Sequence, residues 1–197
     1  MMTIMQRSPR PPGRKELSHE RIVATAARAI RRAGFDGVGV ADIMKEAGLT
    51  HGGFYAHFPS RAALVVEALQ RATEESARST ERAAADPGLQ GASLFRRLVL
   101  AYLSDEHLKA VEQGCPVAAL VSEMPRQAVE VRKASALTVR DLLSRVKSAL
   151  PHQADAGPAI ASQLVGGLQL ARALGANAEG RALLAAVRER LLAEYDR

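Results

Sequence analysis

Apolar residues recur at helical spacing along almost the whole chain, and no segment alternates in the manner of a β-strand. Ile22, Ala26 and Ile30 mark the apolar face of a first helix. Ser18 is its predicted N-cap and Gly34 its predicted end. The hydrophobic pattern therefore predicts an all-α protein.

Eight further helices follow from the same pattern, with their ends marked by glycine, proline and capping residues. A long helix begins after Ser60 and ends at the Asp86-Pro87-Gly88 break, and the others span 40–47, 50–58, 91–104, 116–124, 126–149, 156–174 and 178–196. The chain is thus expected to hold about nine helices.

Two of these helices are short and lie close together. Helix 40–47 and helix 50–58 are joined by the tight turn Gly48-Leu49, in which glycine lets the chain reverse direction. This arrangement is typical of a helix-turn-helix, whose second helix enters the major groove of DNA. The spacing is suggestive only, because many helical bundles contain short helices with glycine between them.

Positive charge is concentrated at the N-terminal end. Of the formal net charge of +6, residues 1–61 carry +5, from ten Lys/Arg and five Asp/Glu. A basic patch confined to one module suits phosphate binding, although a solvated basic tail would give the same composition. We expect a disordered basic arm at 1–15, a helix-turn-helix domain at 16–61 and an effector-binding and dimerisation domain at 62–197.

The sequence around the short helices resembles the DNA-binding domain of the TetR family. The resemblance covers nearly all of 18–64, and its most specific part is the run from Gly53-Phe54-Tyr55 through His57-Phe58 to Ser60-Arg61 and Leu64. It implies a one-component transcriptional regulator, most often a repressor, that binds palindromic operator DNA as a homodimer through helices 156–174 and 178–196. It also implies release by a small-molecule effector that moves the fourth helix.

The DNA-binding residues are assigned partly from this resemblance and partly from position. Arg14 and Lys15 are expected in an extended arm that reaches the DNA, and Phe54 and Phe58 in the core. The predicted contacts are Arg14, Lys15, Gly39, Thr50, His51, Gly52, Gly53, Tyr55, His57 and Arg61.

Two positions depart from the family pattern. Gly39 and Gly53 stand where serine or threonine is usual, so Gly39 keeps only its backbone N–H for a phosphate. His51 becomes the main candidate for reading bases, and the glycines favour close backbone approach and shape readout. His57 is either a backbone contact or a structural histidine. A helical protein-binding adaptor that has lost DNA reading is the alternative function.

The C-terminal module is expected to bind a small molecule in a largely apolar pocket. The candidate residues are Phe95, Tyr102, His107, Cys115, Met124 and Gln163, with Phe95 and Tyr102 as the best pair because seven residues separate them. Cys115 lies at a helix N-cap and is either a sensor of oxidants or electrophiles or a small buried residue.

Apolar stripes on the last two helices suggest a dimer interface. Leu183, Val187, Leu191 and Tyr195 repeat along helix 178–196. Ile160, Leu164, Leu168 and Ala171 do so along helix 156–174, next to Gly166-Gly167. These stripes could equally bury against their own subunit.

Several function classes are not expected. The chain has no apolar run near the roughly 20 residues of a membrane helix, and its N-terminus lacks a secretory signal. The lone Cys115 excludes a multi-cysteine zinc site and suits a reducing cytoplasm. No catalytic signature, metal site or cofactor motif appears, so we expect a cytoplasmic bacterial protein, associated with the nucleoid through DNA, that is not an enzyme.

Overall fold

The computed structural model describes residues 13–196, and that range holds nine α-helices and no strand, which confirms the all-α prediction. The α-helices are α1 (Arg14–Ala33), α2 (Val40–Glu46), α3 (Arg61–Ala84), α4 (Leu94–Tyr102), α5 (Asp105–Lys109), α6 (Pro116–Leu120), α7 (Val129–Ala149), α8 (Gly157–Leu174) and α9 (Ala178–Tyr195). Four short 3₁₀ helices connect them: η1 (His51–Ala56), η2 (Pro87–Leu89), η3 (Met124–Arg126) and η4 (Ala154–Ala156).

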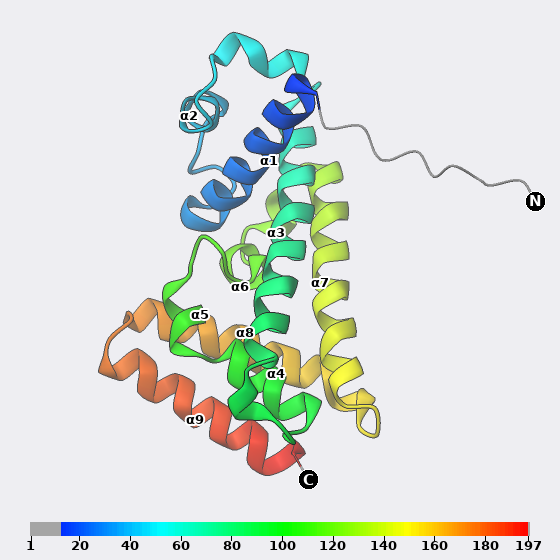
Figure 1. The fold of residues 1–197 in the computed structure, drawn as a ribbon, viewed down its shortest axis with the longest axis vertical. Helices are drawn as coiled ribbons and strands as arrows, with labels where there is room; N and C mark the ends of the chain where they lie inside the picture. Colours follow the sequence, from blue (N-terminus) through cyan, green and yellow to red (C-terminus); the bar gives the residue numbers. More distant parts are fainter. Residues whose placement is uncertain (1–12, 197) are drawn as a thin grey trace, which may run out of the picture.

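The helices form an elongated molecule with two ends (Figure 1). α1, α2 and η1 make one end, and α8 packs on α9 at the other. The long helices α3 and α7 lie side by side and run between the two ends. This arrangement separates the helix-turn-helix from the C-terminal helices, with α3 and α7 between them.

The start of α1 differs from the prediction. α1 begins at Arg14, and Gly13 is its N-cap, because the Gly13 N–H donates to the Glu16 carboxylate at 2.7 Å. Ser18 therefore lies inside the helix and does not cap it. Arg14 and Lys15 belong to the first turn of α1 and not to an extended arm, and the rest of the predicted arm, 1–12, lies outside the described residues.

The predicted and the observed numbers of helices agree, but the two sets of helices differ at two places. The second helix of the helix-turn-helix is the 3₁₀ helix η1, so it is not one of the nine. The sequence pattern also missed α5, a five-residue helix. α5 forms because the Ser104 hydroxyl accepts the His107 N–H at 3.0 Å and Asp105 and Glu106 occupy its first turn.

Two apolar cores stabilise the two ends. The first joins α1, α2, η1 and the first half of α3, and it also takes in Leu120, Met124 and Val131 from much later in the chain. The second joins α4, α6, the end of α7, α8 and α9. The helix-turn-helix end is therefore completed by residues of the C-terminal module.

Arg31 of α1 is the most connected buried polar residue of the described chain. Its side chain is fully buried, and it pairs with Glu75 of α3 at 2.6 Å. The guanidinium also donates to the backbone oxygens of Ala27, Ala72 and Gly114 at 2.9, 3.5 and 3.3 Å. One side chain thus links α1, α3 and the segment before α6.

Two more contacts join the helix-turn-helix end to the same segment. Arg32 pairs with Glu112 at 2.9 Å, and the Phe35 N–H donates to the Glu123 carboxylate at 2.9 Å. Residues 112–123 are therefore held near both ends by α1 and the loop after it.

Between residues 13 and 196, no helix is long and apolar enough to cross a membrane.

Replacing Arg31 with methionine should lower the free energy of unfolding by about 2–3 kcal/mol, because the backbone oxygens lose their donor and Glu75 loses a buried partner. Glu75 still pairs with Arg71 at 2.7 Å in the variant, which limits the loss of stability. Urea denaturation measures the change in the free energy of unfolding.

The neighbouring Arg32→Met variant is the matched control. Arg32 is 44% exposed and pairs only with surface carboxylates, Glu46 and Glu112, so its loss should be below about 1 kcal/mol. Equal losses in the two variants would contradict the role given to Arg31.

Candidate functional site

The helix-turn-helix turn is built on Gly48, whose φ of +69° lies in the left-handed region. The Leu49 N–H donates to the Met44 carbonyl at 2.9 Å and closes the C-terminus of α2. The predicted tight turn is confirmed, and it directs η1 away from α2 at the end of the molecule.

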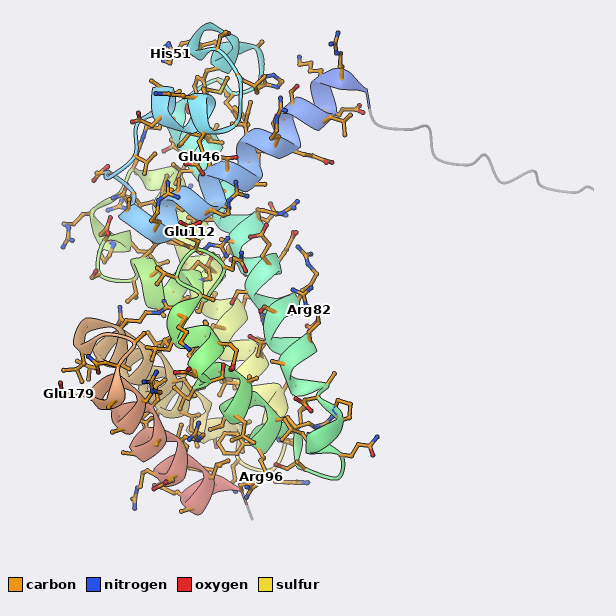
Figure 2. The ribbon with its side chains drawn as sticks, turned by 60° about the vertical axis from the view of Figure 1, so that its left-hand side comes forward. Glu46, His51, Arg82, Arg96, Glu112 and Glu179 are labelled. Atoms are coloured by element: carbon orange, nitrogen blue, oxygen red, sulfur yellow. The ribbon has the colours of Figure 1, made fainter. Side chains whose placement is uncertain are left out.

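Two buried aromatic rings anchor η1 in the N-terminal core. Phe54 and Phe58 are both buried, as predicted, with ring centroids 5.6 Å apart, and the His19 ring of α1 stacks on Phe58. The rest of η1 faces outward: Tyr55 is 74% exposed, and Figure 2 shows His51 at the far end of the molecule from α8 and α9.

Residues 51–56 form a 3₁₀ helix where an α-helix was expected, because two consecutive glycines, Gly52 and Gly53, disfavour α-helix. Thr50 stands at the N-cap position as predicted, but its hydroxyl makes no capping bond. Thr50, His51 and Gly52 are all exposed. They lie close to the exposed Tyr55 in the sequence.

The glycines of η1 are not required by packing. A Cβ at Gly52 would meet nothing within 4 Å, and one at Gly53 would come no closer than 3.7 Å, to the Met44 methyl group. The missing side chains therefore leave open space outside the protein, where a DNA backbone could approach closely.

Two predicted contacts are already engaged within the protein. The Gly39 N–H donates to the Asp42 carboxylate at 3.3 Å, as part of the cap of α2, so it is not free for a phosphate. Arg61 donates to the backbone oxygen of Phe35 and lies 3.8 Å from the Asp36 carboxylate. Arg61 therefore positions the loop before α2.

His57 has features of both roles considered for it. Its Nδ1 is buried and has no hydrogen-bond partner among residues 13–196, while its ring lies 5.9 Å from the ring of His19. Burial, and then the nearby His19 and Lys15, lower the pKa of His57 below its usual value. The lowered pKa favours the neutral ring near pH 7.

A cavity of about 290 Å³ lies between α3, α4, α7 and the first turn of α6. Its wall is mostly apolar, with several hydroxyl groups from α3 and α7. The lining residues are Thr73, Ser76, Ala77, Thr80, Glu81, Ala84, Leu94, Leu98, Tyr102, Cys115, Pro116, Val117, Thr138, Leu142, Ser144, Arg145, Ser148 and Ala149.

Of the six predicted effector residues, only Tyr102 and Cys115 line this cavity. Phe95 shares a face of α4 with Tyr102, but the ring of Tyr195 from α9 covers it, with centroids 6.2 Å apart. The stripe Leu94, Leu98 and Tyr102, spaced by four, faces the cavity instead.

The other three candidates are also placed elsewhere. Met124 is buried in the N-terminal core, and Gln163 lies on an outer face of α8 and α9. His107 stands behind the cavity wall. Its Nε2 accepts the Cys115 N–H at 3.0 Å, so its Nδ1 carries the proton and donates to the Tyr102 carbonyl at 2.7 Å.

His107 is a structural residue in this arrangement. Burial lowers its pKa to about 4, so the ring is neutral near pH 7 and keeps one donor and one acceptor. It thereby fixes the backbone on both sides of the cavity, at Tyr102 and at Cys115. Cys115 itself is buried, and its proposed sensor role stays a prediction.

The sequence of α3 itself indicates the cavity. Along α3, the large apolar residues of the N-terminal half give way to small hydroxyl residues on the same face, Thr73, Ser76 and Thr80. A helix face that becomes small and weakly polar indicates a space that side chains do not fill.

The sequence of residues 22–68 matches the model of the bacterial regulatory proteins of the tetR family. This match covers the helix-turn-helix end of the chain, from within α1 to the first part of α3. The proteins that this family model describes are bacterial regulatory proteins.

Solved TetR-like structures show the same fold along nearly the whole chain. A TetR-family regulator from Agrobacterium tumefaciens has a TM-score of 0.76 at 19% identity, covering 93% of this chain and 100% of its own. The TetR-family regulator SCO4454 from Streptomyces coelicolor has a TM-score of 0.68 at 23% identity, covering 91% and 96%. NemR from E. coli, in its reduced form, has a TM-score of 0.69 at 20% identity, covering 87% and 95%. A comparison with curated protein sequences finds no match.

The stripes expected at the TetR dimer interface mostly face their own subunit. Ile160, Leu164, Leu168, Ala171 and Leu191 are all buried in the second core. Gly167 packs closely against Val187 of α9, within the same subunit. The pattern thus identified the contact between α8 and α9, which was the alternative kept open above.

A different apolar face of α8 and α9 is open to solvent. Leu170 is 60% exposed and Leu174 is also exposed, while a Cβ at Gly166 would meet nothing within 4 Å. A shallow groove on this face is lined by Gln163, Gly166, Gly167, Leu170, Leu183, Ala186, Val187 and Arg190.

Within residues 13–196, no three metal-ligating side chains form a cluster.

Replacing Gly52 with alanine should leave the TetR fold intact and raise the free energy of unfolding by up to about 1 kcal/mol, because the added methyl group meets no atom and the unfolded chain loses freedom. If the DNA backbone approaches at this glycine, affinity for operator DNA should fall. Denaturation and DNA titration measure the two effects.

Gly48→Ala is the contrasting variant, since the positive φ there makes a side chain unfavourable. It should lower stability where Gly52→Ala does not. An unchanged DNA affinity in Gly52→Ala would contradict close approach at η1.

Proposed function

We propose that this TetR-family protein is a transcriptional repressor that binds a palindromic operator as a homodimer and is released by a small-molecule effector in the cavity. The observation that carries the proposal is the pairing of an exposed helix-turn-helix surface at one end with a cavity further along the same α3 helix. We propose no catalytic role, and we place its action on the nucleoid in the cytoplasm.

The proposed DNA contacts come from η1 and from the start of α1. Thr50, His51 and Tyr55 are exposed on η1, and Arg14 and Lys15 add positive charge in the first turn of α1. Hydroxyl, imidazole and cationic groups are the usual partners of phosphates and base edges. His51 is the proposed reader of bases, and the others hold the backbone.

The proposed dimer uses the exposed face of α8 and α9. Exposed leucines such as Leu170 and Leu174 next to Gly166 favour close packing of a second copy, and an isologous contact needs only this one face. Two recognition segments would then meet half-sites about 34–36 Å apart or a multiple of that distance.

The proposed release acts through the segment held between the two modules. Cys115, Pro116 and Val117 line the cavity, and the adjacent Gly114 carbonyl accepts from Arg31. A ligand that displaces the first turn of α6 would therefore disturb contacts to α1 directly. It would lower DNA affinity by the difference between its affinities for the two states.

Selection from random duplex DNA tests the proposal. We expect an enriched palindrome, with an affinity that falls steeply with salt because phosphate contacts release counterions. His51→Ala should relax the sequence preference, whereas Lys15→Ala should weaken binding to all sequences and reduce the salt slope. Recovery of no enriched sequence would overturn the regulator and favour the protein-binding adaptor.

Placing a charge on the proposed interface should separate the dimer. Leu170→Glu buries a carboxylate against its symmetry mate, so we expect a monomer by sedimentation and a large loss of operator affinity. Leu137→Glu is the matched control, because Leu137 is 63% exposed but lies on α7. A Leu170→Glu protein that stays dimeric would rule out this face.

A further inference from the structure

The hydroxyl of Tyr102 has no hydrogen-bond partner among residues 13–196. The side chain is 2% exposed, so it is shielded from bulk solvent, and it lines the cavity beside Cys115. Buried polar groups are almost always bonded, and each exception calls for an explanation. A ligand that supplies the missing partner is the explanation that the cavity offers.

Three other hydroxyls of the cavity wall are already engaged. Thr73 and Thr80 lie 2.8 and 3.0 Å from carbonyl oxygens one turn earlier on α3, and Thr138 lies 3.2 Å from one on α7. Their protons satisfy their own helices. Among the lining residues of the described chain, Tyr102 is the one whose fully buried hydroxyl has no partner.

Charge around the cavity disfavours an ionised ligand. Its two charged lining residues, Glu81 and Arg145, have opposite signs, and Arg145 is paired with Asp141. An ionised ligand at the Tyr102 end would be buried with a single hydroxyl as its partner, which is costly.

The positive charge of Arg172 determines which kind of polar ligand atom fits beside Tyr102. Arg172 donates to the His107 carbonyl at 2.8 Å, and it forms no ion pair with any carboxylate in the range 13–196. Burial, and then the neighbouring Cys115, raise the pKa of Tyr102, and the positive charge of Arg172 partly offsets that rise. A ligand atom with partial negative charge is favoured beside it, and a ligand donor is disfavoured.

We infer that the effector is a small, uncharged, mostly apolar molecule with a carbonyl oxygen that accepts a hydrogen bond from the Tyr102 hydroxyl. A volume of about 290 Å³ suits a small ligand, since ligand pockets usually span about 300–1,000 Å³. The inference deepens the proposed function, because it takes the cavity as the effector site.

Calorimetric titration of the full chain with matched probes tests this assignment. Cyclohexanone, acetophenone and 2-nonanone are each compared with the hydrocarbon in which a methylene group replaces the carbonyl oxygen, and benzoate serves as the anionic probe. In Tyr102→Phe, the Kd of the bound ketone should rise about 5- to 10-fold, as expected for one lost hydrogen bond. The Kd of its hydrocarbon partner should change less than twofold.

Tyr195→Phe is the control, because that hydroxyl lies outside the cavity, and it should leave every Kd unchanged. Without ligand, Tyr102→Phe should keep or raise the melting temperature, since it removes an unsatisfied group. A clear drop would mean that the hydroxyl is bonded within the protein and would overturn the inference.

Three binding results would also overturn it: no ketone binds, benzoate binds more tightly than acetophenone, or ketone and hydrocarbon lose affinity equally in Tyr102→Phe. Operator binding by the same protein without ligand is measured in parallel. Intact operator binding with a failed ketone series rejects the ligand class alone, whereas lost operator binding rejects the regulator itself.

Discussion

The buried guanidinium of Arg31 is the contact on which the relation between the two modules depends. Removing an arginine from water is costly unless nearly all of its donors find acceptors. Here Glu75 supplies the countercharge, and three backbone oxygens accept from three of the four remaining N–H groups. Those oxygens belong to α1, α3 and the segment before α6, so these elements can move apart only by leaving buried donors of Arg31 without acceptors.

This constraint gives the short α6 segment its importance. Its first turn lines the cavity, and the carbonyl of Gly114 just before it bonds to Arg31. At its other end, Glu123 accepts from the backbone of Phe35, in the loop that leads to α2. A displacement of α6 therefore breaks hydrogen bonds at buried positions, which favours two discrete arrangements over a gradual drift.

The sequence predicted local features well and their surroundings poorly. The turn at Gly48, the Ser60 cap, which accepts the Ala63 N–H at 3.1 Å, and the buried pair Phe54 and Phe58 all depend on nearby residues, and all are confirmed. Helical period also indicated correctly which residues share a face.

The helical period of the sequence does not indicate which distant residues cover a given face of a helix. The predictions about the surroundings of a face failed for that reason. Phe95 was expected in the cavity but is covered by α9, and the Leu164 stripe was expected between subunits but faces its own core. Arg61, which the family resemblance assigns to a phosphate, bonds to a loop 26 residues earlier in the chain, and its contact with DNA stays a prediction. Each of these surroundings is decided by residues distant in the chain, which no local pattern contains.

The N-terminal core carries an evolutionary consequence. Leu120, Met124 and Val131, which come about sixty residues after the helix-turn-helix, close the lower side of that core. A gene fusion that joined this helix-turn-helix to a foreign sensor would therefore leave Leu64 and its neighbours uncovered, unless the new partner brought an equivalent apolar segment. Recombination between proteins of this fold is thus restricted to partners whose helices fit the same core.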